Sequence, residues 1–582
     1  MFEVWAPSAT RVEVEIDAAH RHEMTRGSGG WWTAEVPGAG HGTDYTFRLD
    51  GGDPLPDPRT RWQPLGVFGP SRVYDHARFE WTDQSWHGRT LPGSIIYELH
   101  VGTFTTDGTF DAAVERLDHL VDLGVDFVEL LPVPPVPGRH NWGYDGVDLY
   151  AVHEQYGGPD GLKRFVNACH LAGLGVILDV VHNHLGPSGN FLAPFGPYFH
   201  ESASSFWGQA VNLDGRDSDE VRRYFIGNAL HWLRDYHVDG LRLDAVHALH
   251  DNRAVHFLEE LAVETEALSA ALGRPLTLIA ESDLNDPRLV TPREAGGYGL
   301  HAVWDDDVHH ALHAALTGER HGYYCDFGSM DVLAKVLTRA YLHDGTYSTF
   351  RARTHGRPVD RRTTPGHRFV VALQNHDQIG NRARGDRLPA EALRIGAALL
   401  LTSPYTPMLF MGEEWGATTP FLFFTDHTEP HLATGEAERR EREFVGFGYE
   451  DWLGTAPDPQ SEKTFQMSKL NWRELTTPDH ADLLSWYRAL ISLRKSHPAL
   501  TDPRLDQVSA TYDDDANWLT LTRPPFQITA NLSDTPVTLD VPDSALLLTS
   551  NPKTSLVKTS LTLPARSVAI LQTDPQPPGT GR

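Results

Sequence analysis

The chain has little cysteine and no long hydrophobic run. Only two cysteines occur in 582 residues, Cys169 and Cys325, which is too few for a disulfide framework. The longest apolar stretch, IGAALLLTS at 395–403, is well short of the ~18 residues that cross a bilayer. The first sixteen residues alternate polar and apolar types and lack the apolar core of a signal peptide. We therefore expect a cytoplasmic protein with no membrane partner.

Basic residues are also few. Fifty Lys and Arg stand against 78 Asp and Glu, which gives a net charge of −28. This excess argues against a nucleic-acid or anionic-membrane partner and is compatible with a neutral ligand such as a sugar. Aromatic residues are plentiful, with 15 Trp, 18 Tyr and 25 Phe. They can stack on pyranose rings, although most of them are expected in the core.

Both ends of the chain have β patterns. In residues 1–88, Val12, Val14 and Ile16 alternate with polar residues, which predicts an N-terminal β-sandwich of the carbohydrate-binding type. Its tryptophans, Trp5 and the pair at 31–32, could form a sugar-stacking face or fill the core, and we favour the core. Residues 501–582 predict a C-terminal β-domain with a disordered tail, DPQPPGTGR.

Between these ends, residues 89–500 alternate short apolar runs with helical patterns. This alternation predicts a (β/α)₈ barrel of the α/β class, extended by insertions at 185–208 and 421–463. Gly124 is a plausible C-terminal cap of the helix before the second strand. The eight predicted strands are 95–99, 125–131, 175–181, 238–244, 276–281, 300–304, 369–374 and 406–411.

Three of these strands stop at a carboxylate: Asp244, Glu281 and Asp377. Barrel strands bring their carboxyl ends to one rim, so the three can converge on one pocket. Retaining glycosidases need one ionised carboxylate and one protonated carboxyl. Arg242 shares a strand face with Asp244 and would keep it ionised, whereas Glu281 follows the apolar LTLIA, which would raise its pKa. The pattern indicates glycosyl chemistry.

Four segments in order, DVVHNH (179–184), GLRLDAVH (240–247), IAESD (279–283) and LQNHDQ (373–378), resemble the signature regions of the α-amylase superfamily. The resemblance implies a (β/α)₈ barrel in which Asp244 is the nucleophile, Glu281 the acid/base and Asp377 the stabiliser of the transition state. It also implies substrate-binding roles for further residues in or near these segments: Tyr144 in NWGYD, His184, Arg242, His247, His376 and Gln378.

Longer stretches, among them ESDLNDPRLV and QNHDQIGNR, are similar to members of that superfamily that act on maltooligosyltrehalose. This similarity implies hydrolysis of the α-1,4 bond next to the terminal α,α-1,1-linked glucose pair, with release of trehalose. In WDDDVHH it places Asp305 and His309 near the leaving sugar; a solvated acidic loop or a calcium cluster are the alternatives.

Two other functions stay open at this point. A glycogen branching transferase would use the same fold and the same glycosyl-enzyme, and another α-glucan-active enzyme would keep the same carboxylates. A catalytically silent glucan-binding scaffold would be expected to have lost a member of the triad, and all three carboxylates are present.

No cofactor and no catalytic metal are expected. Adjacent residues such as His182, Asn183 and His184 cannot all face one ion, and there is no HExxH pattern. Asp179 is interpreted as a helix cap or as a support for the pocket. Trp207 could be a stacking platform or a core residue.

Overall fold

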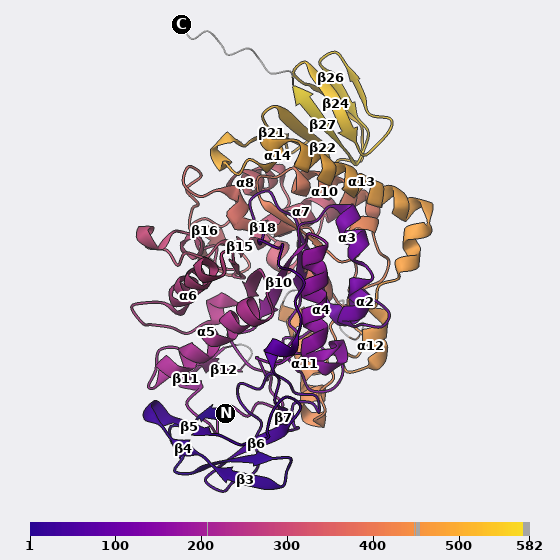
Figure 1. Ribbon diagram of the computed structural model, residues 1–582. Coiled ribbons are helices and arrows are strands. Elements are labelled where there is room, and N and C mark those ends of the chain that lie inside the picture. The colour runs from indigo at the N-terminus through magenta and orange to yellow at the C-terminus, as the bar shows by residue number, and fades with distance from the viewer. Residues whose placement is uncertain (206–207, 447–448, 450–453, 455, 574–582) are drawn as a thin grey trace.

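A closed barrel of eight parallel strands forms the centre of the computed structural model (Figure 1). The structure describes residues 1–205, 208–446, 449, 454 and 456–573. The predicted (β/α)₈ fold is confirmed, and all eight barrel strands overlap the predicted ones. In barrel order they are β8 (Ile96–Leu99), β9 (Phe127–Leu130), β10 (Gly175–Val180), β13 (Gly240–Leu243), β14 (Thr277–Ala280), β15 (Ala302–Trp304), β18 (Phe369–Ala372) and β19 (Thr406–Phe410).

The interior of the barrel has two layers. Residues two apart on a strand face the same way, so a strand that directs one residue into the barrel directs another there two positions later. The first layer is apolar and belongs to one buried cluster that includes Ile96, Phe127, Ile177 and Ile279. Two residues further along the same strands come Glu98, Glu129, Asp179 and Glu281, with Arg242 paired to Asp179 across the β10–β13 ladder. The apolar layer closes the barrel, and the ionisable layer faces the rim formed by the strand ends.

Helices lie between most of the strands and cover the outside of the barrel (Figure 1). Gly124 ends α3 with φ 93°, and its N–H donates to the Leu120 carbonyl, as predicted for a glycine cap. The helices are α1 (Val101–Phe104), α2 (Phe110–Val114), α3 (Leu117–Leu123), α4 (Gly158–Leu171), α5 (Ser218–Asp235), α6 (Phe257–Leu272), α7 (Asp306–Thr317), α8 (Met330–Arg339), α9 (His376–Gly380), α10 (Ala390–Leu401), α11 (Pro430–Gly446), α12 (Glu462–Met467), α13 (Pro478–Ser496) and α14 (Pro498–Thr501).

The N-terminal part of the chain forms two antiparallel sheets at one end of the molecule (Figure 1). Trp5 and Trp32 are buried in the hydrophobic core, which confirms the core interpretation for both. Trp31 is half-buried, and the Arg59 guanidinium lies over its ring. The sheets are β1 (Phe2–Trp5), β5 (Trp31–Ala34) and β4 (Thr25–Arg26), and β3 (His20–Glu23), β2 (Val12–Ile16), β6 (Asp44–Leu49) and β7 (Ser71–Arg72).

The C-terminal sheets lie at the opposite end (Figure 1). Arg494 of α13 and Arg523 of β21 are buried against the barrel and donate to main-chain carbonyls, including those of Ser403 and Leu500. The sheets are β20 (Ser509–Asp513), β21 (Trp518–Arg523), β22 (Phe526–Asn531), β27 (Ser567–Thr573) and β24 (Ser544–Thr549), and β23 (Val537–Asp540), β26 (Ser560–Leu563) and β25 (Ser555–Val557). The domain boundaries at 88/89 and 500/501 stay predictions.

Two further two-stranded sheets lie outside the barrel and the terminal domains. They pair β11 (Phe199–Ser205) with β12 (Gly208–Val211), and β16 (Thr346–Ser348) with β17 (Arg353–His355). Trp207 and the tail from residue 574 lie outside the described residues.

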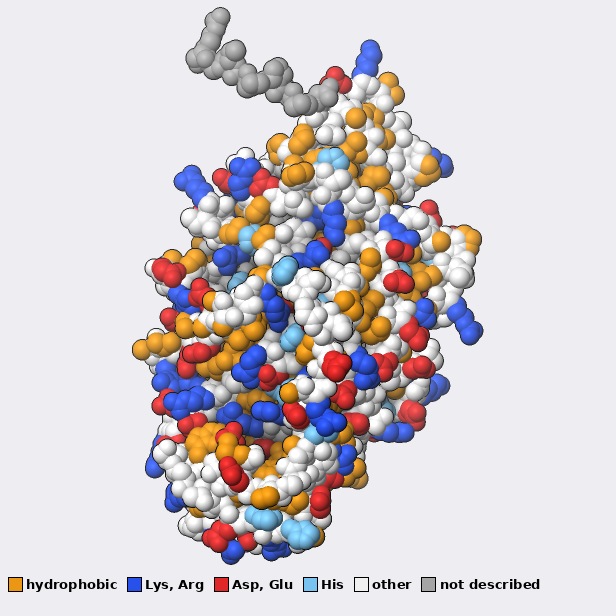
Figure 2. All heavy atoms as spheres, viewed as in Figure 1, with side chains coloured by type: hydrophobic (Ala, Val, Ile, Leu, Met, Phe, Trp, Pro, Cys, Tyr) orange, Lys and Arg blue, Asp and Glu red, His pale blue; other side chains and the backbone are white. Residues whose placement is uncertain are grey.

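Cys169 is buried, as expected, and burial raises the pKa of its thiol. On the face in Figure 2, acidic and basic side chains are interspersed over the barrel. Within the described part of the chain, no helix is both long and apolar enough to span a membrane.

Candidate active site

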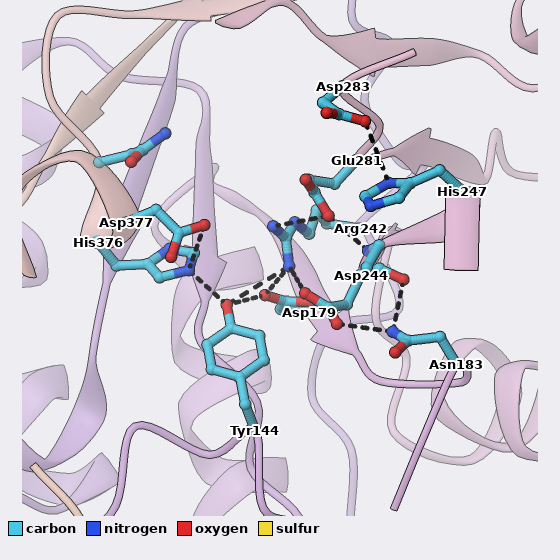
Figure 3. A network of polar contacts seen from close by, with 12 residues as sticks. Tyr144, Asp179, Asn183, Arg242, Asp244, His247, Glu281, Asp283, His376 and Asp377 are labelled. Carbon is cyan, nitrogen blue, oxygen red and sulfur yellow. Dashed lines mark hydrogen bonds and ion pairs between the residues drawn. The ribbon is translucent and has the colours of Figure 1, made fainter. Parts of the chain in front are cut away.

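The three predicted carboxylates line one cavity of about 950 Å³. Asp244 directly follows β13, Glu281 directly follows β14, and Asp377 lies in the first turn of α9, after β18. Figure 3 shows them around Arg242, with Tyr144 on the opposite side of the space from Glu281. Convergence follows from the fold, because the carboxyl ends of barrel strands form one rim.

Arg242 is the centre of the polar network. Its Nη1 donates to Asp179 Oδ2 at 2.7 Å and to Asp244 Oδ1 at 2.9 Å, while Nη2 lies 3.8 Å from Glu281 Oε2 (Figure 3). Burial opposes the charge on Arg242, but Asp179, Tyr144 and Asp244 outweigh it and raise its pKa well above the usual value. A permanent cation is therefore bonded directly to Asp244. Asn183 Nδ2 donates to the other oxygen of Asp244 at 2.7 Å.

Glu281 lies in surroundings that favour a protonated carboxyl group. Burial is the largest influence and, with the negative charges of Asp244, Asp306 and Asp377, raises its pKa to about 8, against the opposing effect of Arg242. Its Oε2 accepts a hydrogen bond from the N–H of Ala245 at 2.5 Å. Glu281 therefore keeps its proton at neutral pH and can act as an acid, while its neighbour Asp244 is bonded to the Arg242 cation.

His376 joins the third carboxylate to the network. Its Nδ1 lies 2.6 Å from Glu98 Oε1. Its Nε2 lies 2.8 Å from Tyr144 Oη and 3.6 Å from Asp377 Oδ2 (Figure 3). Burial disfavours the charged ring, but Asp377 and Glu98 outweigh it and raise the pKa of His376 to about 9. The imidazolium is the form that can donate from both ring nitrogens, so a second cation faces the cavity beside Asp377.

Tyr144 and His184 line the same cavity. The Tyr144 hydroxyl donates to Asp179 Oδ2 at 2.5 Å, and its ring stacks on His376 with centroids 5.2 Å apart. His184 Nε2 lies 2.9 Å from the Tyr144 carbonyl oxygen, and its Nδ1 lies 2.6 Å from Asn183 Oδ1. The structure thus brings together six predicted residues besides Glu281 and Asp244: Tyr144, His184, Arg242, His376, Asp377 and the supporting Asp179.

Four other predicted residues do not line this cavity. His247 follows Asp244 by three residues, and its Nδ1 lies 4.0 Å from Asp283 Oδ1 (Figure 3). His309 and Gln378 line a separate cavity of about 160 Å³, where His309 bonds to the Leu373 carbonyl and Tyr324 Oη. Asp305 is buried at the start of α7. Direct sugar contact by Asp305 or His309 therefore needs a different arrangement from the one observed, because both side chains are enclosed by protein.

Sequence reasoning missed two features of the site. Glu98 lies within β8, and the signal was a charged residue inside an otherwise apolar strand, IYEL. Helix α11 covers one side of the cavity with charged side chains, and its Arg440 donates to Asn381 Oδ1 at 2.8 Å and to the Gly380 carbonyl at 3.1 Å. These bonds fix the far end of α9, the helix that carries Asp377. No periodic pattern in the 421–463 insertion indicated this contact.

Comparisons with known proteins agree with the geometry. Residues 76–205 match the alpha amylase catalytic domain model, and residues 1–63 match carbohydrate-binding module 48, the isoamylase N-terminal domain. A crystal structure of a Salmonella typhimurium protein that is 37% identical superimposes with a TM-score of 0.90, covering 98% of this chain and 97% of that one. A pullulanase from Paenibacillus barengoltzii, 20% identical with a TM-score of 0.72, shares the fold.

Two curated relatives cover nearly the whole chain. The malto-oligosyltrehalose trehalohydrolase of Rhizobium sp. (strain M-11) is 53% identical over 582 residues, covering 98% of this chain and 97% of its own length. That of Saccharolobus solfataricus is 44% identical, covering 89% and 88%. The 1,4-alpha-glucan branching enzyme of Thiobacillus denitrificans is 32% identical over 72% of this chain but only 59% of its own length.

The barrel and its paired carboxylates define a glycosidase of the α-amylase superfamily. Within that class the chain belongs to the malto-oligosyltrehalose trehalohydrolase family. The predicted fold, enzyme class and superfamily are confirmed.

Proposed function

We propose that this protein hydrolyses the α-1,4-glucosidic bond next to the terminal trehalose unit of maltooligosyltrehalose and releases trehalose and a maltooligosaccharide. The observation that carries the reaction type is the contrast between Asp244, bonded to Arg242 at 2.9 Å, and Glu281, whose pKa is raised to about 8. A glycosidase needs a carboxyl group placed beside a cation, where it can attack, and a neighbouring carboxyl group that keeps its proton. Similarity over 98% of the chain to a trehalohydrolase supports the substrate.

The first step breaks the glycosidic bond. The Asp244 carboxylate attacks the anomeric carbon of the maltooligosaccharide, and the Glu281 carboxyl gives its proton to the departing oxygen of trehalose. Asp377 and the His376 imidazolium lie at the side of the cavity, where they bind hydroxyl groups of the same glucose. A carboxylate at the position of Asp377 stabilises the positive charge that develops in the transition state.

The second step releases the sugar from the enzyme. Glu281, now a carboxylate, takes a proton from a water molecule whose oxygen attacks the same anomeric carbon, and the bond to Asp244 breaks. Two displacements retain the α configuration. Arg242 contributes to both steps, since it bonds to Asp244 Oδ1 at 2.9 Å and lies 3.8 Å from Glu281 Oε2, the group that becomes a carboxylate in the first step.

The experiment is a comparison of two substrates. The protein is incubated with maltooligosyltrehalose and, separately, with a plain maltooligosaccharide of the same length. We expect free trehalose from the first and much slower cleavage of the second. Equal cleavage of both, without release of trehalose, would overturn the proposed substrate.

A branching transferase is the second candidate, because one such enzyme is 32% identical over 72% of this chain. It would pass the glucan from Asp244 to a sugar hydroxyl instead of water. Incubation with amylose separates the two reactions: a rise in α-1,6 linkages favours the transferase, and an unchanged linkage pattern favours the hydrolase.

A further inference from the structure

A second cavity, of about 350 Å³, lies between the N-terminal sheets and helix α5, and it shares no lining residue with the catalytic cavity. Its volume is within the roughly 300–1,000 Å³ that small-molecule sites occupy. The N-terminal sheets contribute Tyr45 and Arg72, the loop between β6 and β7 contributes Arg59 and Arg61, and α5 contributes one wall, which includes Arg234. The reaction proposed above uses none of these residues.

Four arginines line this cavity in a chain whose net charge is −28. Two have carboxylate partners outside the lining: Arg72 bonds to Asp44 at 2.5 and 2.9 Å, and Arg234 to Asp235 at 2.8 and 3.0 Å. Arg59 and Arg61 form no ion pair with any residue that the structure describes. The cavity therefore presents two guanidinium groups with capacity for an anion.

Arg59 is held in place by aromatic rings. Its guanidinium carbon lies 5.3 Å from the Trp31 ring centre, 5.7 Å from that of Tyr150 and 5.4 Å from that of Tyr224. Aromatic faces fix the cation without neutralising it. Two carboxyl groups, Glu3 and Asp57, also line the cavity. Asp57 accepts hydrogen bonds from Tyr45 Oη and from the N–H of Arg59, and burial raises its pKa. Arg59 is thus preorganised to bind a ligand oxygen.

The neighbouring His76, His231 and Asp235 lie close enough together to suggest a metal site, but the charges argue against one. Both ring nitrogens of His231 already have partners, Asp235 at 2.9 Å and the Tyr150 carbonyl at 3.1 Å. Arg234 occupies both oxygens of Asp235, and Lys163 Nζ lies 3.2 Å from the His76 carbonyl oxygen. A metal ion would meet two cations here, whereas an anion would be attracted.

We propose that this cavity binds a small phosphate-bearing ligand, with the phosphate on Arg59 and Arg61. The planar guanidinium groups offer paired N–H donors that match phosphate oxygens. Tyr45, Tyr74 and Tyr150 give the cavity aromatic walls beside the arginines, which would suit a sugar ring attached to the phosphate. Such a ligand would bridge the N-terminal sheets and α5, the helix that leads into the strand carrying Arg242.

Calorimetric titration of the full chain in a low-salt buffer tests this site, with glucose 6-phosphate, inorganic phosphate and glucose as probes. We expect the two phosphate probes to bind and glucose not to bind. Tighter binding of glucose 6-phosphate would identify the ligand as a sugar phosphate, and equal binding would identify it as free phosphate. Failure of both phosphates to bind, or equally tight binding of glucose, would overturn the proposal.

Two variants locate the binding. Arg61 is exposed and unpaired, so Arg61→Ala should leave the fold intact and weaken phosphate binding roughly tenfold or more. Arg473→Ala is the matched control, since Arg473 is also exposed and lines neither cavity. Affinity that is unchanged in Arg61→Ala, or lost equally in Arg473→Ala, would place the anion elsewhere and refute the site.

Discussion

Glu98 binds His376 twice: one carboxylate oxygen accepts the main-chain N–H of His376 at 3.0 Å, and the other lies 2.6 Å from Nδ1 of its ring. Both side chains are buried. The pair fixes the position of the residue next to Asp377 and keeps a positive charge on the ring that faces the cavity. Glu98 touches no substrate in this arrangement, so it acts as a positioning residue.

Glu98→Gln should weaken the positive charge on the His376 ring while keeping the volume of the side chain at position 98. Glu98 is one of the groups that raise the pKa of His376, so the pKa should fall below about 9. We expect kcat to fall about tenfold or more, because each pKa unit corresponds to roughly 1.4 kcal/mol of charge stabilisation. NMR titration of the histidine ring measures the first effect, and steady-state kinetics measures the second.

Glu129→Gln is the matched control for Glu98. Burial, together with Glu98 and Asp179, raises the pKa of Glu129 well above its usual value, which favours the neutral carboxyl group. Replacing it with an amide should change the kinetics much less. Equal losses of kcat in both variants would show that any change among the ionisable side chains inside the barrel is harmful. The Glu98–His376 pair would then have no special role.

The pH profile should have an alkaline limb set by Glu281. Its proton is present below a pKa of about 8 and is lost as the pH rises through that value, so kcat/KM should fall roughly tenfold per pH unit above it. Asp306 is one of the charges that raise this pKa, and Asp306→Asn should move the limb to lower pH. A limb that stays in place in this variant would contradict the assignment.

Glu281→Gln and Asp244→Asn should both lose activity by roughly 10²-fold or more, for different reasons. Glu281→Gln keeps the nucleophile, so a substrate analogue whose leaving group needs no proton should form a stable glycosyl-enzyme. Asp244→Asn has no nucleophile and should form none. Intact-protein mass spectrometry distinguishes the two, and a covalent adduct in Asp244→Asn would refute its role.

The junction of the barrel and the C-terminal sheets gives a prediction about stability. Arg494 is buried and donates to the carbonyls of Leu401, Ser403, Leu500 and Tyr405. Arg494→Met would leave these acceptors unpaired and should lower the free energy of unfolding by roughly 2–4 kcal/mol. Thermal unfolding measures the change. Arg504→Met, which removes an arginine from the surface, should leave the melting temperature unchanged, and a similar loss there would contradict this reasoning.

The sequence predicted the barrel well because its strands are buried on both sides and read as short apolar runs. The strand ends were predicted one or two residues too long, as at 406–411 against Thr406–Phe410, since apolar residues such as Met411 continue into the loops. The positions of Asp244 and Glu281 followed from the strand ends. Contacts between distant segments could not be predicted this way: Glu98 meets His376 across 278 residues, and Arg440 meets α9 across 60.

Hydrolysis with retention of configuration and release of trehalose can be followed directly by proton NMR of the reaction with maltooligosyltrehalose. Spectra taken in the first minutes report both the free trehalose and the anomer of the new reducing end. We expect trehalose together with the α-anomer, which then equilibrates with the β form. Early β-anomer, or a reducing end that appears without trehalose, would contradict this expectation.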